Sequence, residues 1–329
     1  MVKKRIKLEN NVKETIKIEN VRKEDGTLTI KIWNDSFDFF LKQKLLQGLS
    51  DRTLRDYKMY KKFADNYFQE YLGLQEYNEL KVEHFVEYIS YMKFTKEYAN
   101  NTINIRLRYP KAYLTWLYDE ELIDRNISKK IKLVKTPTDT VRAFTDAEVR
   151  KLLKVIDKNT YRGFRDYTFF LLILDTGIRV SEALNLTNKD IDLTNAMITV
   201  QADNSKTNEL RYLPVSFNVI SLLRELRKVT KSYNDKYAFV NETGDQLTYN
   251  AIRISMDRYK NKAGLDKCTL YMLRHTFATN AVKQGIDTFT LQKLLGHKEL
   301  ATSRKYVQLN KEFLIEKKSR INTIKNYIR

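Results

Sequence analysis

A basic segment with a single proline, residues 129–138, divides the chain between two stretches whose apolar residues recur at helical spacing. Proline fixes its own φ and disfavours helix for the residue before it, so this segment is predicted to be extended. In a chain of 329 residues, each side of the segment is long enough to bury a core of its own. The sequence therefore predicts two mainly helical domains joined by a basic linker at residues 129–140.

The stretch before the linker is predicted to form a small all-α domain at residues 34–128. Its apolar residues recur at helical spacing from Phe37 onward. Ser50 is placed to cap the second of four expected helices, and Pro110 is expected to kink or interrupt the fourth.

The two ends of the chain differ from the domains between them. Within residues 1–33, apolar and polar residues alternate on both sides of Asp25-Gly26, which favours a β-hairpin whose second strand includes Ile30 and Ile32. Residues 311–329 carry an apolar stripe at helical spacing and are predicted to form a C-terminal helix. Because an exposed stripe is costly in water, we expect it to pack on a neighbouring protomer or back on its own domain.

The stretch after the linker is predicted to form a second domain at residues 141–310. Its first helix follows Thr145, which with Glu148 forms the sequence pattern of a capping box. Two strand-like runs, Met197–Val200 and Leu210–Val215, flank a polar turn, and the rest is helical in its periodicity. The predicted fold class is mainly α with a small antiparallel β-sheet.

The balance of charges indicates a polyanionic partner. The chain has 60 Lys and Arg against 41 Asp and Glu, a net charge of +19, which favours nucleic acid or an anionic membrane surface. Cys268 is the single cysteine, so a disulfide framework or a cysteine-based zinc finger within the chain is excluded. The three histidines form no HExxH pattern, and no metal site is expected. The sequence shows no signal peptide or membrane span, and we expect a cytoplasmic protein.

Four segments of the second domain carry residues suited to the chemistry of a phosphate group. Arginine and lysine supply positive charge, histidine exchanges protons near neutral pH, and tyrosine supplies a hydroxyl. Alone, each residue is better explained by a solvated surface, a helix cap or a half-buried ring than by catalysis. The residues are Arg179 after a Thr-Gly turn, Lys206 in the turn between the two strands, Arg274, His297 after a glycine, and Tyr306.

Together, these segments resemble the tyrosine recombinase, or phage integrase, family. Arg274 precedes His297 by 23 residues and His297 precedes Tyr306 by 9, as in that family. Lys206 precedes Arg211 by 5 residues, which is similar to the spacing in the family's β-hairpin. The resemblance extends from about residue 37 to the C-terminal tail.

The resemblance implies a site-specific DNA recombinase that cleaves and rejoins strands through a 3′-phosphotyrosine formed by Tyr306. Arg179 and Arg274 would stabilise the charge of the phosphorane transition state. Lys206 would protonate the leaving 5′-oxygen, and His297 would hydrogen-bond a non-bridging oxygen. Because the phosphotyrosine conserves the energy of the phosphodiester, no cofactor such as ATP is expected. The two arginines would do the work that a metal ion does in other phosphoryl-transfer sites, so no metal ion is expected either.

The resemblance also implies that the first domain is a SAM-like core-binding domain for double-stranded DNA recombination sites. It carries the weaker family pattern Ser50-x-x-Thr53-x-x-x-Tyr57, followed by Asn101-x-Ile103. We expect a homotetramer on DNA that docks through the C-terminal helix, association with the nucleoid, and an accessory DNA-bending or directionality factor. The candidate DNA contacts are Arg52, Thr53, Arg55, Asn101 and Arg106.

One position departs from the family pattern. The family usually has histidine three residues before the second arginine, where this chain has Tyr271. An ordinary phenol has a pKa of about 10 and is a poor general base near pH 7, so Tyr271 is interpreted as auxiliary, orienting water or Tyr306. His275 is interpreted as structural, because one helical position turns its direction by about 100° from that of Arg274.

Several biological roles stay open. The N-terminal extension favours a mobile-element integrase, which integrates or excises DNA. The alternative within the family is an Xer-like recombinase that resolves DNA dimers. Outside these roles stand a type IB topoisomerase-like enzyme that relaxes DNA and a non-catalytic DNA-binding relative, and Tyr271 is the only feature that favours the latter.

Overall fold

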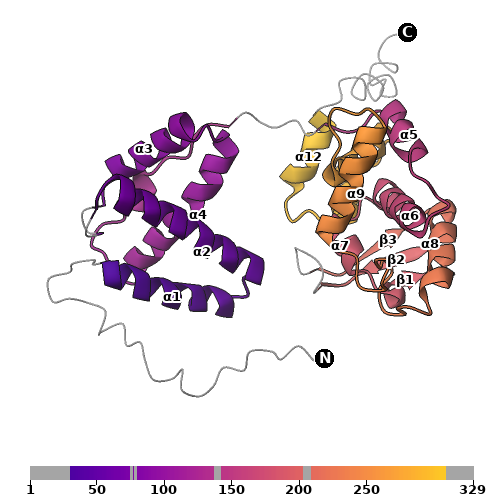
Figure 1. Cartoon of the computed structure of the whole chain (residues 1–329), viewed down its shortest axis with the longest axis horizontal. Helices are drawn as coiled ribbons and strands as arrows, with labels where there is room; N and C mark the ends of the chain where they lie inside the picture. The colour runs from indigo at the N-terminus through magenta and orange to yellow at the C-terminus, as the bar shows by residue number, and fades with distance from the viewer. Residues whose placement is uncertain (1–29, 75–76, 78–79, 137–141, 203–208, 309–329) are drawn as a thin grey trace, which may run out of the picture. The chain divides into compact units, whose positions relative to one another are not determined.

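The computed structural model describes residues 30–74, 77, 80–136, 142–202 and 209–308. The chain separates into two compact units, Met1–Asp139 and Thr140–Arg329 (Figure 1). The predicted fold class is confirmed, because the described elements are mostly helices with one small antiparallel sheet. None of the helices in these ranges is long and apolar enough to cross a membrane.

The first unit consists of α-helices extended by short π-helical and 3-10 turns. Ser50 caps α2 as predicted, because its Oγ accepts a hydrogen bond from the backbone N–H of Thr53 at 3.3 Å. The described elements are α1 (Ile30–Leu46), α2 (Asp51–Asn66), η3 (Tyr67–Tyr71), α3 (Val82–Ser90), η5 (Tyr91–Thr95), α4 (Asn100–Asp119) and η6 (Ile127–Lys130).

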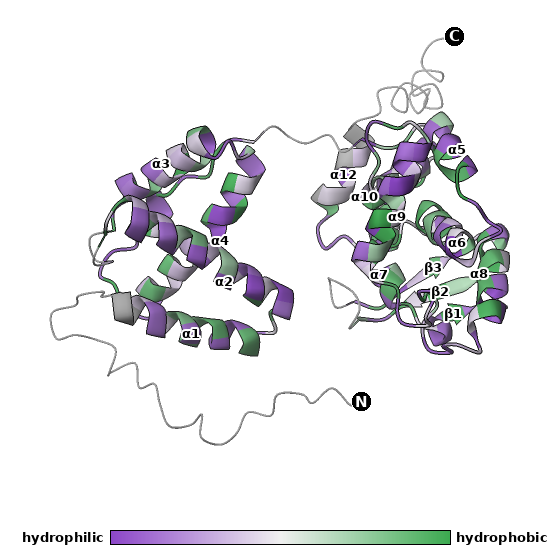
Figure 2. Ribbon diagram, in the orientation of Figure 1, coloured by the Kyte–Doolittle hydropathy of each residue, from purple (hydrophilic) through white to green (hydrophobic). Residues whose placement is uncertain are grey.

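Aromatic rings dominate the core of the first unit. Trp33 is 1% exposed and stacks on Tyr77, with ring centroids 4.2 Å apart. The hydroxyl of Tyr113 donates to the backbone carbonyl of Trp33 at 2.6 Å. Figure 2 shows hydrophobic and hydrophilic residues mixed along α1 and α4, as expected for helices with one buried face. Burial of each large ring contributes about 2–3 kcal/mol to this core.

Helix α1 corrects the prediction for residues 1–33. The predicted second strand of the hairpin includes Ile30, but α1 begins at that residue, so this part of the prediction is wrong. Trp33, Phe37 and Phe40 are buried at a spacing of four and three residues, and this helical pattern overrides the alternation. The rest of the predicted hairpin, residues 1–29, lies outside the described residues.

The segment after α4 runs back along that helix. The Asn104 side chain donates to the carbonyl of Val134 and accepts from its N–H, both at 2.8 Å. Ile131 is buried in the core of the first unit, so the start of the predicted linker belongs to this unit. Pro110 lies inside α4 without interrupting it.

The second unit packs helices beside an antiparallel sheet with strand order β1-β2-β3 (Figure 1). The predicted capping box forms at the start of α5, where Thr145 and Glu148 exchange hydrogen bonds. The described elements are α5 (Asp146–Lys154), α6 (Tyr161–Thr176), α7 (Val180–Asn185), η7 (Asn188–Asp190), β1 (Ile191–Asp192), β2 (Met197–Val200), β3 (Arg211–Pro214), α8 (Phe217–Thr230), α9 (Tyr249–Lys262), α10 (Leu270–Lys283), α11 (Thr288–Leu295) and α12 (Leu300–Gln308).

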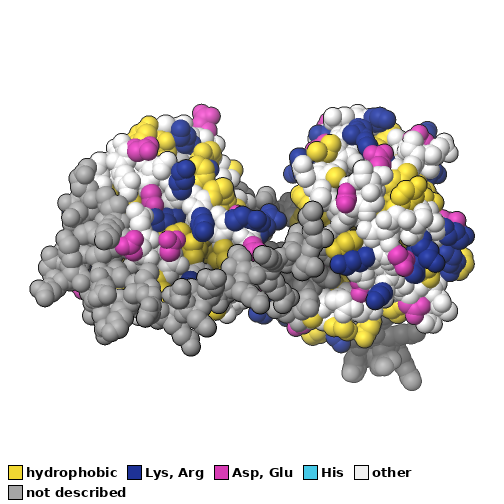
Figure 3. Space-filling model, turned by 60° about the horizontal axis from the view of Figure 1, so that its bottom comes forward, with side chains coloured by type: hydrophobic (Ala, Val, Ile, Leu, Met, Phe, Trp, Pro, Cys, Tyr) yellow, Lys and Arg dark blue, Asp and Glu magenta, His cyan; other side chains and the backbone are white. Residues whose placement is uncertain are grey.

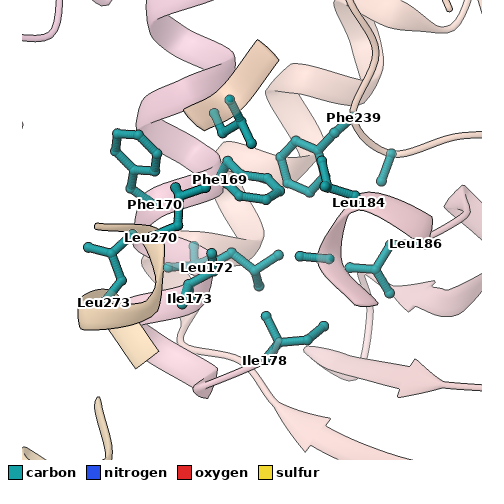
Figure 4. Close-up of a cluster of buried hydrophobic side chains, with 14 of the residues drawn as sticks. Phe169, Phe170, Leu172, Ile173, Ile178, Leu184, Leu186, Phe239, Leu270 and Leu273 are labelled. Atoms are coloured by element: carbon teal, nitrogen blue, oxygen red, sulfur yellow. The ribbon is translucent and has the colours of Figure 1, made fainter. Parts of the chain in front are cut away.

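Helix α6 runs through the core of the second unit. Phe169 and Phe170 are fully buried on it, and Figure 4 shows Phe169 facing Phe239, with ring centroids 5.0 Å apart. Leu270 and Leu273 of α10 belong to the same cluster. This packing fixes the C-terminal end of α6, from which the chain enters the candidate site.

A buried ion pair lies near the start of α6, away from its C-terminal end. Arg165 donates to Oδ1 of Asp166 from Nε at 2.9 Å and from Nη2 at 2.7 Å, and its Nη1 donates to the carbonyl of Val240 at 3.1 Å. The hydroxyl of Tyr259 donates to the other carboxylate oxygen at 3.0 Å. Both charges are therefore paired and hydrogen-bonded, which is the condition for burying them.

Candidate active site

Arg179 lies at the turn between α6 and α7. The helix α6 ends at Thr176, and Gly177 follows with a φ of 65°, in the left-handed region that favours glycine. A Cβ atom at Gly177 would lie 2.3 Å from Cδ1 of Phe277, so a larger residue would clash. Arg179 is the N-cap of α7, and its backbone N–H donates to Glu182 at 3.0 Å.

Glu182 joins two arginines in the interior of the second unit. It is 1% exposed, and its Oε1 accepts from Nη1 of Arg179 at 2.8 Å and from Nη1 of Arg211 at 3.1 Å. The second oxygen accepts from Nη2 of Arg211. Burial alone would raise the pKa of Glu182, but hydrogen bonds and charge from Arg211 and Arg179 lower it overall, so the carboxylate is ionised at neutral pH.

The C-terminal end of α11 supplies a carbonyl group to each of three arginines. Helix ends leave carbonyls without helical partners and carry partial negative charge. The bonds run from Arg211 to Leu294, from Arg274 to Leu295 and from Arg179 to Gly296. Within the described ranges, Glu182 is the only carboxylate hydrogen-bonded to these arginines, so the cluster keeps an excess of positive charge.

Arg274 is the most buried of these arginines, with 4% of its surface exposed. Its Nη1 donates to the carbonyl of Gly177 and its Nη2 to the carbonyl of Leu295, both at 2.7 Å. Burial and then the charge of Arg179 lower the pKa of Arg274 to about 10. The guanidinium is therefore still charged at neutral pH, and its orientation is fixed.

His297 follows Gly296, which ends α11 with a φ of 62°. The Nδ1 atom of His297 lies 2.8 Å from Oγ of the buried Ser303 on α12. Burial, and then the charges of Arg274 and Arg179, lower the pKa of His297 to about 4. The imidazole is neutral at pH 7, so one ring nitrogen is a donor and the other an acceptor.

Tyr306 lies on α12 and is 7% exposed. Its ring packs in a cluster with Leu291 and Leu295, and it lies parallel to the ring of His297 with centroids 6.4 Å apart. Burial raises the pKa of Tyr306, Tyr271 raises it further, and the charge of Arg274 opposes the rise. The phenol is protonated at rest.

Tyr271, His275 and Tyr306 form a continuous row of rings. Tyr271 is 57% exposed and meets the His275 ring nearly edge-on, with centroids 4.3 Å apart. His275 is 6% exposed, and its ring centroid lies 5.2 Å from that of Tyr306. The structure thus connects the residue that departs from the family pattern to Tyr306 through a histidine.

The structure brings together Arg179, Arg274, His297 and Tyr306 of the predicted site. Lys206 lies in residues 203–208, outside the described residues, between the described strands β2 and β3. The described part of the chain contains no group of three or more His, Cys, Asp or Glu residues placed to hold a metal ion.

The candidate DNA contacts of the first unit occupy different environments. Arg52, Arg55 and Asn101 are exposed, whereas Thr53 is partly buried beside Ser50. The guanidinium of Arg106 instead lies between two rings, 4.1 Å from the centroid of Phe63 and 4.2 Å from that of Tyr98. On the face drawn in Figure 3, Lys and Arg side chains are interspersed with acidic and hydrophobic ones.

Sequence reasoning missed two residues that hold the site together. Arg211 alternates with exposed Tyr212 on β3 and therefore shares the buried face with Leu213. A charged residue on the buried face of a strand indicates a buried partner, and this signal could have found the pairing with Glu182. Ser303 carries no comparable signal, because its contact with His297 depends on how α12 packs.

Comparison with known proteins shows which family this chain resembles. Residues 142–312 match the phage integrase family. Tyrosine recombinase XerA of Pyrococcus furiosus is 30% identical over 288 residues, covering 86% of this chain and 92% of that protein. Tyrosine recombinase XerA of Thermococcus onnurineus is 28% identical over 287 residues, covering 86% and 94%. The structure of the Tn1549 transposon integrase with a circular intermediate DNA shares the fold, with a TM-score of 0.71, 20% identity, and coverage of 85% of this chain and 98% of that one.

The fold and the residues gathered at the end of α11 define an enzyme of the tyrosine recombinase class. The chain belongs to the phage integrase family, which matches more than half of its length.

Proposed function

We propose that the protein cleaves and rejoins double-stranded DNA at specific sites through a covalent bond between Tyr306 and a 3′-phosphate. The observation that carries this proposal is the grouping of Tyr306 with three arginines, of which two share the carboxylate of Glu182 and the third, Arg274, is held by backbone carbonyls. That cluster keeps an excess of positive charge beside a tyrosine, which suits a bound phosphodiester. The phenol releases its proton to water as its oxygen bonds to phosphorus, the 5′-oxygen leaves and takes up a proton, and a later attack by a 5′-hydroxyl reverses the step and frees the phenol.

Each residue of the cluster has a proposed role in that reaction. Arg179 and Arg274 stabilise the non-bridging oxygens of the transition state, and their bonds to backbone carbonyls orient them before DNA binds. When Nδ1 of His297 accepts the proton of Ser303, its Nε2 carries a hydrogen and donates to a phosphate oxygen. Lys206 is proposed as the acid that protonates the 5′-oxygen.

Support for a DNA substrate comes from charge and from the relatives. The chain has a net charge of +19, and the similar transposon integrase was solved with DNA. We assign the first unit to DNA core binding, with the predicted bounds of 34–128 widened to include α1 from Ile30 and the buried Ile131, and we assign the rest of residues 129–140 to the linker and residues 141–310 to catalysis. Residues 311–329 are proposed to dock on a neighbouring protomer in a homotetramer at the nucleoid, and an accessory DNA-bending or directionality factor completes the proposed assembly.

Integration or excision of a mobile element is the first proposed role. Xer-like resolution of DNA dimers is the second, and it is favoured by the match to XerA proteins over more than nine tenths of their length. The two roles differ in the DNA that is cleaved. An integrase recognises the ends of its element, whereas an Xer-like enzyme recognises a chromosomal site.

The test is a nicked duplex that traps the covalent intermediate, made with candidate sites from DNA flanking the gene. The wild-type protein is expected to form an adduct that survives SDS, also in EDTA, and Tyr306→Phe is expected to form none. Tyr249→Phe, which changes a 55% exposed tyrosine of the same unit, is the matched control. An adduct that persists in Tyr306→Phe contradicts the assignment of the nucleophile. Relaxation of supercoiled DNA without strand exchange would instead favour a topoisomerase-like enzyme.

A further inference from the structure

The imidazole of His275 is a buried polar group that the proposed chemistry leaves without a task. Its Nε2 atom is shielded from solvent and has no hydrogen-bond partner among the described residues. Unsatisfied buried polar atoms are rare in folded proteins, because burying them without a partner is costly. A residue kept only for packing would be better replaced by an apolar side chain of similar size.

The surroundings of this imidazole indicate what its missing partner is. The centroid of the Tyr306 ring is 5.2 Å from that of the imidazole, with a tilt of 42° between the planes. The ring of Tyr271 stands at 74° to the imidazole, with centroids 4.3 Å apart. Both neighbouring rings carry a hydroxyl, and that of Tyr306 is the hydrogen-bond donor on the ring proposed to react.

The charge state of His275 fits the role of a hydrogen-bond acceptor. Burial and then the adjacent charge of Arg274 lower the pKa of His275 to about 4, so the ring is neutral at pH 7. A neutral imidazole with Nε2 unprotonated accepts one hydrogen bond there. Such a weak base orients the phenol but does not keep its proton.

We propose that His275 is a positioning residue for the nucleophile: its Nε2 accepts a hydrogen bond from the Tyr306 hydroxyl and holds that oxygen in line with the scissile phosphate. Tyr271 supports the imidazole through its ring, which gives a task to the residue that departs from the family pattern. The inference rests on the proposed function of Tyr306. It replaces the sequence-based interpretation of His275 as purely structural.

The test compares three substitutions of His275 that differ in where they place a polar atom. Glutamine places an amide near the position of Nε2, asparagine places it near Nδ1, and leucine removes it. With saturating nicked DNA, His275→Leu is expected to slow adduct formation about 10- to 100-fold, while DNA affinity stays within about twofold. His275→Gln is expected to recover most of the rate, and His275→Asn is not.

Thermal unfolding of each variant separates positioning from folding. If the cleavage rate follows the melting temperature, or if glutamine and leucine give equal rates, the positioning role is wrong. Tyr271→Phe keeps the ring and is expected to retain the rate within about threefold, whereas Tyr271→Ala is expected to lose about tenfold. A wild-type rate of adduct formation in His275→Leu would refute the positioning role of His275. It would leave the proposed function standing, because the dependence on Tyr306 is measured separately.

Discussion

The two units differ in the kinds of side chain that they bury. In the first unit, no Lys, Arg, Asp or Glu among the described residues is buried, and its core consists of aromatic rings packed with aliphatic side chains. The second unit buries several charged side chains, which are Arg165, Asp166, Glu182, Asp190, Arg211 and Arg274. Since a buried charge is costly unless it is paired, the second unit gives up stability that an apolar core would supply.

The buried charges of the second unit differ in turn from one another. Arg165 and Asp166 balance each other, so this pair has no charge left for a ligand. At the end of α11, Arg179 and Arg211 share Glu182, and Arg274 is held by backbone carbonyls alone, so positive charge is left over. We infer that balanced burial supports the fold, whereas unbalanced burial prepares a site for an anion.

Replacing Glu182 by glutamine should have the largest effect, because it should lower both the stability of the second unit and the rate of DNA cleavage. The substitution leaves the buried Arg211 and the partly buried Arg179 without their carboxylate, so we expect the second unit to lose about 3–5 kcal/mol and DNA cleavage to fall more than about 100-fold. Adduct formation on nicked DNA measures the second effect. Glu225→Gln is the control, because Glu225 pairs with Lys228 on the surface and contributes less than about 1 kcal/mol.

Tryptophan fluorescence adds a test of which unit is affected. Both tryptophans, Trp33 and Trp116, belong to the first unit, so their emission reports its unfolding, while circular dichroism reports both units. Glu182→Gln is expected to shift the dichroism transition and leave the fluorescence transition in place. Equal shifts in both signals would mean that the units unfold together and that the comparison does not separate them.

Replacing Asp166 by asparagine should destabilise the second unit without changing the chemistry. Arg165 then lies buried without its counter-charge, which is expected to cost about 3–5 kcal/mol. Below the melting temperature, the cleavage rate per folded molecule should stay within about twofold of the wild type. A loss of cleavage as large as that of Glu182→Gln would contradict the distinction between balanced and unbalanced burial.

The sequence predicts local features of this protein better than the contacts that complete the site. The Ser50 cap and the capping box at Thr145 depend on residues three positions apart and were predictable. The carbonyls at the end of α11 accept hydrogen bonds from arginines of three other segments. These contacts join residues far apart in the sequence and depend on how the helices pack, so the sequence pattern did not predict them. The start of α1 was missed because both alternation and helical spacing occur around residue 30, and burial of Trp33 decides between them.

Acid should destabilise the second unit through two histidines, the buried His275 and the partly buried His297. Burial lowers the pKa of both His275 and His297 to about 4 in the folded state, whereas an unfolded histidine has a pKa of about 6.5. The unfolded chain therefore binds more protons between these values, and the free energy of unfolding falls as pH drops from about 6.5 to 4. By this linkage His275 alone accounts for a loss of about 3 kcal/mol by pH 4, measured by dichroism and removed in His275→Gln, and His297 adds to the loss. An unchanged stability over this range would show that the two imidazoles are not buried as neutral groups.

The smallest expected effect tests the aromatic core of the first unit. Tyr113→Phe removes one hydroxyl, which donates to the buried carbonyl of Trp33, and keeps the ring. The carbonyl is left without this donor, so we expect a loss of about 1–2 kcal/mol in the fluorescence transition and none in DNA cleavage. Tyr118→Phe on the same helix, at a residue 39% exposed, should change neither. If Tyr113→Phe also slows cleavage, then catalysis in the second unit depends on the packing of the first unit's core. The two units would then not have the separate roles that the comparison assigns to them.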